Sequence, residues 1–259
     1  MMLKRVIART VSELSALRFG ASSYRSGFRI LFYHSIGSRI AGDSYGMSVK
    51  PRLFAEHMAI LANTEGLRLV GMIEGQQQGK APLRVAVSFD DGYKDNFYVA
   101  APILLRHHIP FTVFVTSAFA RKPSDIFMNA RELRELSALP GVTIGSHGAT
   151  HIALDACDEP TLWKELADSK NELEDIIGKP VTVISYPYGF VNRTVIEAVK
   201  KIGYAVGACS RFDINDATRN PLLLCRTEIV AADSERVFVQ KLRGAWDWYR
   251  WRARDPVSL

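Results

Sequence analysis

Residues 85–92 read Val85-Ala86-Val87-Ser88-Phe89-Asp90-Asp91-Gly92, an apolar run that ends in two adjacent carboxylates. A short apolar run of this kind is typical of a buried strand, here residues 84–89. Two like charges at the end of a buried strand repel each other, and buried anions need partners. A metal ion would meet both needs. The stretch therefore predicts a buried strand that carries a metal site at its carboxyl end.

Strand and helix patterns alternate along the rest of the chain. Strands are predicted at residues 29–34, 67–70, 84–89, 111–116, 142–145, 181–185 and 204–208, with short β pieces at 222–225 and 228–230. Helices are predicted at residues 49–63, 93–108, 129–139, 159–177 and 192–202, and from Asp233 as a cap to about Trp248. Such alternation is typical of a parallel sheet with crossover helices and fits a (β/α) barrel. An open doubly wound sheet is the alternative, but no nucleotide-binding glycine motif supports it.

The surplus of positive charge lies at the two ends of the chain, whose net charge is +6. Residues 1–29 carry six Lys or Arg against one acidic residue, and residues 236–254 have the same excess. We expect a basic extension over residues 1–27, one barrel domain over 28–232, and a basic, Trp-rich helix and tail over 233–259. Because no nucleic-acid recognition motif accompanies the basic ends, nucleic acid is not an expected partner.

Val6, Val11, Leu14 and Leu17 are roughly helically spaced beside basic residues. The pattern indicates either a helix packed on the domain or an amphipathic helix attracted to anionic lipid. The sequence has no run of 18 apolar residues and no apolar core of a secretory signal near its start. We therefore expect a cytoplasmic protein, in peripheral contact with the inner membrane surface through its basic ends, and leave export by another route open.

The three cysteines, at positions 157, 209 and 225, are an odd set without CxxC spacing. They predict neither a disulfide framework nor a zinc ribbon, and they favour a reducing compartment.

A second group of reactive side chains follows the strand predicted at 142–145. His147-Gly148-Ala149-Thr150-His151 places two imidazoles four residues apart, so that on a helical turn both would face the same way. With Asp91 they make a set of two histidines and a carboxylate, which leaves positions open on a divalent metal. Zn²⁺ is our first expectation, and Co²⁺, Ni²⁺ or Fe²⁺ would also accept this set. Asp90 is then available to take a proton from the attacking water.

Three motifs in this order resemble those of the polysaccharide deacetylase superfamily, also known as NodB homology domains or carbohydrate esterase family 4. Ser88–Gly92 resembles the TFDDG motif of that family, with Ser in place of Thr. Residues 145–151 resemble its metal-binding H[ST]xxH motif, with Gly148 at the second place. Tyr186-Pro187-Tyr188-Gly189 resembles its RxPYG motif. The resemblance covers about residues 28–230 and is nearest to the exopolysaccharide and poly-N-acetylglucosamine deacetylases.

The resemblance implies a distorted (β/α)7-type barrel and an enzyme that hydrolyses N-acetyl groups with a metal. The implied substrate is an N-acetylhexosamine unit of a surface polysaccharide or of its lipid-linked or nucleotide-linked precursor. Asp90 corresponds to the catalytic base, and Asp91, His147 and His151 correspond to the metal ligands. Tyr188 corresponds to the residue whose backbone N–H stabilises the oxyanion. Further contacts with the acetylated glycan are expected from Tyr186, Pro187 and Asp213.

Two features depart from the family pattern. Ser185 stands where many members have an Arg that orients the base, and Arg226 or Arg211 is a candidate replacement. The LxH motif that supplies the general acid in many members is missing from residues 222–226. His34 resembles a strand-end His of the exopolysaccharide branch and can hold a proton near neutral pH, so we expect it to be the general acid. The alternative is a strand-end His that only bonds to backbone.

Two other functions stay open from the sequence. The protein could cleave an O-acetyl ester or a small amide, or it could be a degenerate member that binds glycan without turnover. Ser185 and the missing LxH motif favour the degenerate member. The intact aspartate pair argues against it, because a protein that only binds glycan does not need a base.

Overall fold

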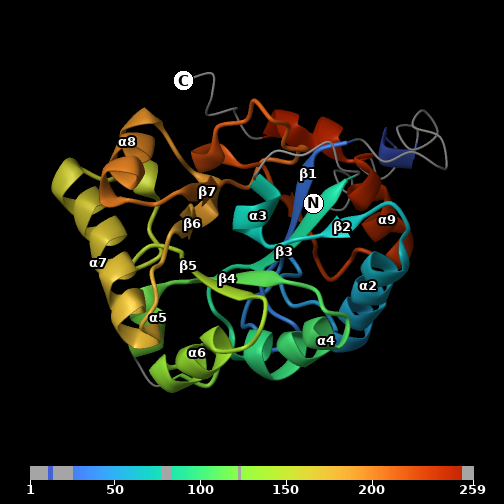
Figure 1. The fold of residues 1–259 in the computed structure, drawn as a ribbon, viewed down its shortest axis with the longest axis horizontal. Helices are drawn as coiled ribbons and strands as arrows, with labels where there is room; N and C mark the ends of the chain where they lie inside the picture. Colours follow the sequence, from blue (N-terminus) through green and yellow to red (C-terminus); the bar gives the residue numbers. More distant parts are fainter. Residues whose placement is uncertain (1–10, 14–25, 77–82, 122–123, 253–259) are drawn as a thin grey trace.

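The computed structural model describes residues 11–13, 26–76, 83–121 and 124–252, and its centre is one curled parallel sheet ringed by helices (Figure 1). The strands follow the order β7-β6-β5-β4-β3-β1-β8, and β2 pairs with β3 beside this path. Their bounds are β1 Phe28–Tyr33, β2 Arg68–Leu69, β3 Arg84–Phe89, β4 Phe111–Val115, β5 Val142–Ser146, β6 Val183–Ser185, β7 Val206–Ala208 and β8 Thr227–Glu228. Parallel pairing throughout, with helical crossovers, agrees with the predicted barrel-type α/β fold.

The strand predicted from residues 84–89 has those bounds and lies beside β1 in the middle of the sheet. All residues of β1 and β3 are buried, as expected for central strands of a parallel sheet that is covered on both faces. The register pairs Tyr33 with Phe89, so that the segments after these two residues leave the sheet side by side.

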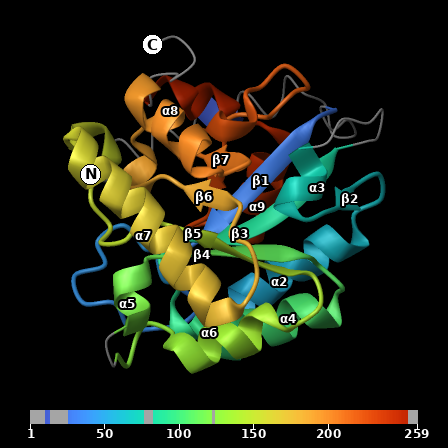
Figure 2. The same ribbon diagram turned by 60° about the vertical axis from the view of Figure 1, so that its left-hand side comes forward.

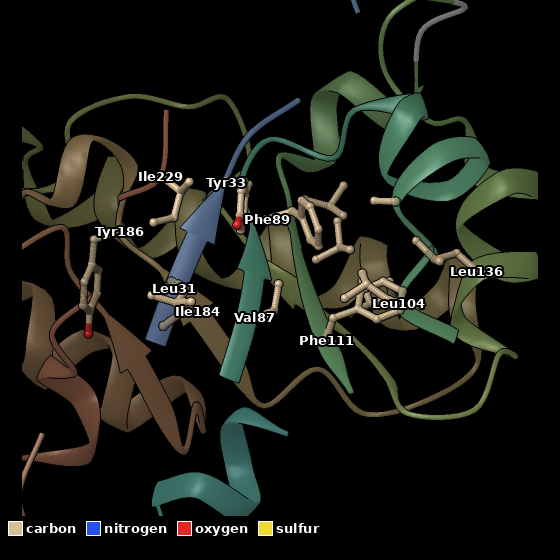
Figure 3. Packing of buried hydrophobic residues seen from close by; sticks show 14 of the residues in the cluster. Leu31, Tyr33, Val87, Phe89, Leu104, Phe111, Leu136, Ile184, Tyr186 and Ile229 are labelled. Carbon is tan, nitrogen blue, oxygen red and sulfur yellow. The ribbon is translucent and has the colours of Figure 1, made fainter. Parts of the chain in front are cut away.

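Side chains of the strands alternate between two apolar cores. Leu31, Val87 and Phe111 face the helices, where they belong to the same cluster as Leu104 and Leu136 (Figure 3). The inner face of the curled sheet holds a smaller cluster that consists mainly of alternate strand residues. Its members are Phe28, Ile30, Val70, Met72, Ala86, Phe114, Val183, Val206, Ala208 and Leu224.

Residues 224–228 join the two edges of the curled sheet. Leu224 bridges Ala208 of β7, with Leu224 N–H donating to Gly207 O at 2.8 Å. Three residues later, Thr227 of β8 pairs with Leu31 of β1. Between these contacts lies Arg226, whose side chain is fully buried. The strand predicted at 222–225 is wrong in part, because residues 221–223 form a 3₁₀ turn and Leu224 alone makes a bridge.

The helices cover the outer face of the sheet, except α3, Met72–Gln76, whose Met72 belongs to the inner cluster. The bounds of the other helices are α2 Pro51–Asn63, α4 Ala101–Arg106, α5 Ser117–Arg121, α6 Ala130–Ser137, α7 Glu159–Ile177, α8 Arg193–Ile202 and α9 Glu235–Arg243. Helices α7 and α8 lie together on the β5–β7 side, whereas α2 and α9 lie on the β1 side (Figures 1 and 2). The predicted helix at 159–177 is confirmed, with Asp158 as its N-cap and Gly178 at φ 67° after its last turn.

Two predicted helices differ from the structure. The segment predicted at 93–108 divides into a π-helical turn, Asn96–Ala100, followed by α4. The last helix is capped by Ser234 rather than by Asp233, and it stops at Gly244, φ 88°, rather than near Trp248. Asp233 instead accepts a hydrogen bond from Lys241 Nζ at 2.5 Å. A 3₁₀ segment, Asp247–Arg252, follows the helix.

The basic end segments contact each other where they are described. Trp248 Nε1 donates to Ser12 Oγ at 3.0 Å, and Arg236 forms an ion pair with Glu13. The remaining predictions for residues 1–10 and 14–25, and for 253–259, lie outside the described residues. No helix in the described part of the chain has the length and apolar character needed to span a membrane.

Candidate active site

The reactive residues singled out in the sequence follow the carboxyl ends of neighbouring strands. His34 follows β1, Asp90 and Asp91 follow β3, and His147 follows β5. Since residues two apart along a strand share a face, His34 continues the inner face of Ile30, and Asp90 continues that of Ala86. The parallel order therefore gathers these side chains at one end of the barrel, where barrel enzymes hold their sites.

Asp91, His147 and His151 form a compact cluster of candidate metal ligands. Asp91 Oδ1 lies 3.5 Å from His147 Nε2 and 3.3 Å from His151 Nε2. One ligand atom from each residue lies within 4.8 Å of the others. Ligand atoms of a tetrahedral zinc are about 3.3 Å apart when each bond is about 2.0 Å long. Asp91 Oδ1 is also buried and has no hydrogen-bond partner among the described residues, so the cluster fits a divalent metal.

The imidazole of His147 is held in the form that a metal requires. Its Nδ1 lies 2.8 Å from the carbonyl oxygen of Ser185, so this nitrogen carries the hydrogen and Nε2 keeps its lone pair toward Asp91. Burial lowers the pKa of His147, which favours the neutral ring. The pKa of His151 is raised: its burial acts to lower it, but the carboxylate of Asp91 outweighs that effect.

The histidine pair is brought together by an irregular loop rather than by a helical turn. Gly148 has φ 75° and His151 has φ 62°. The carbonyl oxygens of Gly148 and Ala149 accept hydrogen bonds from Ser117 and Ala118 at the start of α5, at 3.2 and 2.9 Å. These carbonyls are therefore engaged across the sheet edge and do not begin a helix.

Backbone strain concentrates at this end of the barrel. Among the described residues, four non-glycine residues have positive φ, and three of them are Asp91, His151 and Tyr188, at 73°, 62° and 61°. A left-handed conformation at such residues costs on the order of 1 kcal/mol each and persists where the surroundings enforce it. Strain at predicted site residues is typical of a functional site.

Arg226 makes a bidentate ion pair with Asp90. Its Nη1 and Nη2 donate to the two carboxylate oxygens, each at 2.7 Å, and Nη2 also donates to Ser185 Oγ at 2.7 Å. The guanidinium is stacked over Phe32, 4.2 Å from the ring centroid. Burial alone would raise the pKa of Asp90, but Arg226 holds that pKa well below its usual range. Asp90 is thus an ionised, oriented carboxylate, and Arg226, one of the two candidates from the sequence, occupies the role left vacant at Ser185.

His34 lies next to Asp90, because Tyr33 pairs with Phe89 and Asp90 N–H donates to Tyr33 O at 3.0 Å. Burial raises the pKa of both aspartates, and the charge of His34 is among those that lower it. The carbonyl oxygen of His34 accepts from Asn96 Nδ2 at 2.8 Å, whereas its buried Nδ1 has no hydrogen-bond partner among the described residues. Asp95 anchors the loop that follows, accepting from Ser35 Oγ at 2.5 Å. The backbone of His34 is therefore fixed, while its ring makes no hydrogen bond to the described backbone through Nδ1.

Tyr188 places an aromatic ring over the metal-ligand cluster. Its ring meets that of His151 edge to face at 4.8 Å, and its hydroxyl lies 3.5 Å from His151 O. More than half of Tyr188 is exposed, as is more than half of Phe190, whose ring centroid is 5.9 Å away. The two rings form an exposed aromatic rim beside the site.

The family model for polysaccharide deacetylases matches residues 77–207, which include the aspartate pair, both histidines and Tyr188. The chain belongs to the polysaccharide deacetylase family. His34 and Arg226 lie outside the matched range.

Relatives of this chain agree with the family assignment. It is 32% identical over 184 residues to the putative polysaccharide deacetylase YxkH of Bacillus subtilis, covering 69% of this chain and 62% of that protein. It is 28% identical over 145 residues to the poly-beta-1,6-N-acetyl-D-glucosamine N-deacetylase of Staphylococcus aureus, covering 51% and 50%. The chain thus spans between half and two thirds of the length of these curated relatives. The Streptococcus pyogenes deacetylase PplD, solved with acetate, has a TM-score of 0.75 at 23% identity over 84% of this chain and 98% of that one, which confirms the predicted barrel fold.

Two predicted substrate contacts are not supported by the placement of their side chains. Tyr186 is fully buried and donates from its hydroxyl to Leu222 O at 2.7 Å, so its ring packs in the core rather than against substrate (Figure 3). Asp213 precedes Asn215, which pairs with Phe28 at the amino end of β1, whereas the site lies past the carboxyl end. Asp213 also forms an ion pair with Arg250 at 3.0 Å, away from the cluster.

Pro187 is buried and lies 3.6 Å from where a side chain on Gly148 would begin, so it packs against the histidine loop. Asp95 and Glu165, which hold the loops that carry His34 and the histidine pair, were not predicted from the sequence. Both lie on predicted helices, where an acidic residue normally indicates a solvated face, and the burial that distinguishes them is visible only in the fold.

Proposed function

We propose that this protein is a metal-dependent hydrolase that removes N-acetyl groups from N-acetylhexosamine units of a surface polysaccharide or its lipid-linked or nucleotide-linked precursor. The observation that carries this proposal is an ionised, arginine-held Asp90 beside the cluster of Asp91, His147 and His151. The Staphylococcus aureus relative is by name a deacetylase of poly-beta-1,6-N-acetyl-D-glucosamine, which supports an acetylated glycan as substrate.

Asp91, His147 and His151 would hold the divalent metal, with Zn²⁺ as the first candidate because two imidazoles and a carboxylate suit it. A metal bound there lowers the pKa of water and polarises the acetyl carbonyl. The remaining chemistry belongs to side chains of this protein.

Asp90 takes a proton from the water that attacks the acetyl carbonyl, and it is ionised for that purpose because Arg226 faces it. The Tyr188 backbone N–H stabilises the negative charge that develops on the acetyl oxygen. His34 protonates the departing nitrogen as the carbon–nitrogen bond breaks. The products are acetate and a free amine on the sugar.

The test is hydrolysis of β-1,6-linked N-acetylglucosamine oligomers by metal-loaded protein, with acetate and free amine both measured. Equal amounts of the two identify an N-deacetylase. Acetate without amine, from O-acetylated substrate alone, would identify an esterase, and binding without either product would identify a degenerate member. D90N that keeps its metal and full activity would contradict the mechanism.

We also propose a cytoplasmic location with peripheral contact between the basic ends and the inner membrane surface. The contacts of Ser12 with Trp248 and of Glu13 with Arg236 support the membrane contact, because they bring the two basic segments together. Trp251 and Arg236 are exposed there. Cosedimentation with anionic vesicles, but not with neutral ones, is the expected result.

A further inference from the structure

We propose that Glu165 of α7 is the positioning residue that moulds the loop between His147 and His151 into a metal-binding conformation. This inference rests on the proposed metal site. Glu165 lies on α7, contacts the loop between the two histidines and touches no reacting atom.

Three donors of the loop converge on the Glu165 carboxylate. The backbone N–H groups of Ala149 and Thr150 both donate to Oε2 at 2.9 Å, and Thr150 Oγ1 donates to Oε1 at 2.6 Å. Glu165 is 6% exposed. The carboxylate thus accepts from three donors of a loop that makes no helical hydrogen bonds of its own.

The loop conformation matches this role. Gly148, at φ 75°, turns the chain so that two successive N–H groups point to the same oxygen, which is the geometry of a backbone nest for an anion. A Cβ added at Gly148 would lie 3.3 Å from Glu165 Oε2. The Gly that replaces the Ser or Thr of the family motif therefore fits a loop that closes tightly on this carboxylate.

The two ligands depend on the loop to different degrees. His147 has anchors of its own, since its N–H donates to Val115 O at 2.9 Å and its ring bonds to Ser185 O. His151 follows directly after the held residues and adopts a strained backbone at φ 62°. Its placement beside Asp91 therefore depends on the Glu165 contacts to Ala149 and Thr150, together with the hydrogen bond that Ala149 O accepts from Ala118 N–H.

Loss of the carboxylate leaves buried donors without an acceptor, and the loop must relax. Groups that orient ligands in this way change metal affinity by about 10–100-fold when they are removed. Gln in place of Glu165 can keep all three contacts, because its carbonyl oxygen accepts from both backbone groups and its amide donates to the Thr150 hydroxyl.

The experiment is the dissociation constant for Zn²⁺, measured without substrate by competition with a chromogenic chelator. E165L is expected to bind about 10–100-fold more weakly than wild type, and E165Q to stay within about threefold of it. The matched control is E174L on the same helix, because Glu174 accepts from Lys170 Nζ and Val181 N and from no residue of the loop. E174L is expected to keep wild-type affinity even where it lowers the melting temperature of the metal-free protein.

Wild-type affinity in E165L would overturn the proposal, and so would an equal loss in E174L, which would indicate general destabilisation. Should E165L fail to fold, T150V removes one of the three contacts and is expected to weaken binding about three- to tenfold; unchanged affinity there would overturn the proposal as well. Tight Zn²⁺ binding without deacetylase activity would remove the proposed function and leave this inference standing. A wild-type protein that binds no divalent ion would remove both.

Discussion

Replacing Arg226 by Met removes the guanidinium that faces Asp90 and keeps a side chain that fills much of the same space. The two partner side chains are 0% and 4% exposed, so R226M leaves a buried charge without compensation. Breaking a buried ion pair from one side costs about 3–5 kcal/mol of folding free energy. At about 2–4 °C for each kcal/mol, the melting temperature should fall by roughly 6–20 °C.

Activity of R226M should fall as well, because Asp90 loses the two hydrogen bonds that fix the plane of its carboxylate. A positioned general base contributes about 10²–10⁴-fold, so we expect kcat for acetate release to fall by about 100-fold or more, with a smaller change in KM. Metal content, measured on the same samples, should be unchanged. The exchange variant S185R/R226S, which moves the cation onto β6, should regain activity relative to R226S, because Ser185 Oγ already lies 2.7 Å from the guanidinium.

Two results would refute this reasoning. One is wild-type kcat in R226M at full metal content. The other comes from the double variant D90N/R226M, in which neither charge remains. It should be more stable than R226M alone, because the uncompensated carboxylate is gone. Equal or lower stability of the double variant would show that Asp90 is not an isolated charge in R226M.

Three further predictions concern other residues. H34Q should lower kcat by about 100-fold while Zn²⁺ affinity stays at the wild-type level, and equal kcat would remove His34 as the acid. Chelation should abolish deacetylation, Zn²⁺ should restore it, and D91N should need a higher Zn²⁺ concentration for restoration, as followed by acetate release. Burial lowers the pKa of His57 from 6.5 to about 4. The stability that the neutral His57 ring contributes is therefore complete above about pH 6.5 and is lost as the pH falls toward 4. The total loss is about 3 kcal/mol of unfolding free energy. H57N should show a flatter loss of stability over that interval in denaturant titrations, and an unchanged slope would contradict the assignment.

Local pattern was enough to predict the elements whose own residues decide their structure. The run at 84–89 is buried on both faces, and the helix at 159–177 carries its own start and stop residues, so both were found with correct bounds. The last helix was misplaced by one cap because Asp233 and Ser234 are both good caps, and the ion pair of Asp233 with Lys241 decides between them. That choice depends on a tertiary contact.

The site also has parts that local sequence predicts and parts that depend on tertiary contacts. The aspartate pair and the two histidines could be grouped from the sequence, because strand ends in a parallel sheet meet at one edge. The shape of the histidine loop could not, since it depends on Glu165, which lies 14 residues beyond His151 along the chain on a separate helix. Asp213 was placed at the site only as a polar loop residue, and the pairing of Asn215 with Phe28 sends that loop to the opposite end of the barrel.

Asp90 is paired with a cation only after the segment at 224–228 has joined the two edges of the sheet. Asp90 and Arg226 are 136 residues apart, and the guanidinium enters the barrel only when this segment lies between β7 and β1. A ribosome that has made residues up to β7 has already produced both aspartates and both histidines, but no cation for the base. Under the proposed function, such a nascent chain would hold all three metal ligands before its base is oriented, and hydrolysis would begin only once residues 224–228 have closed the barrel.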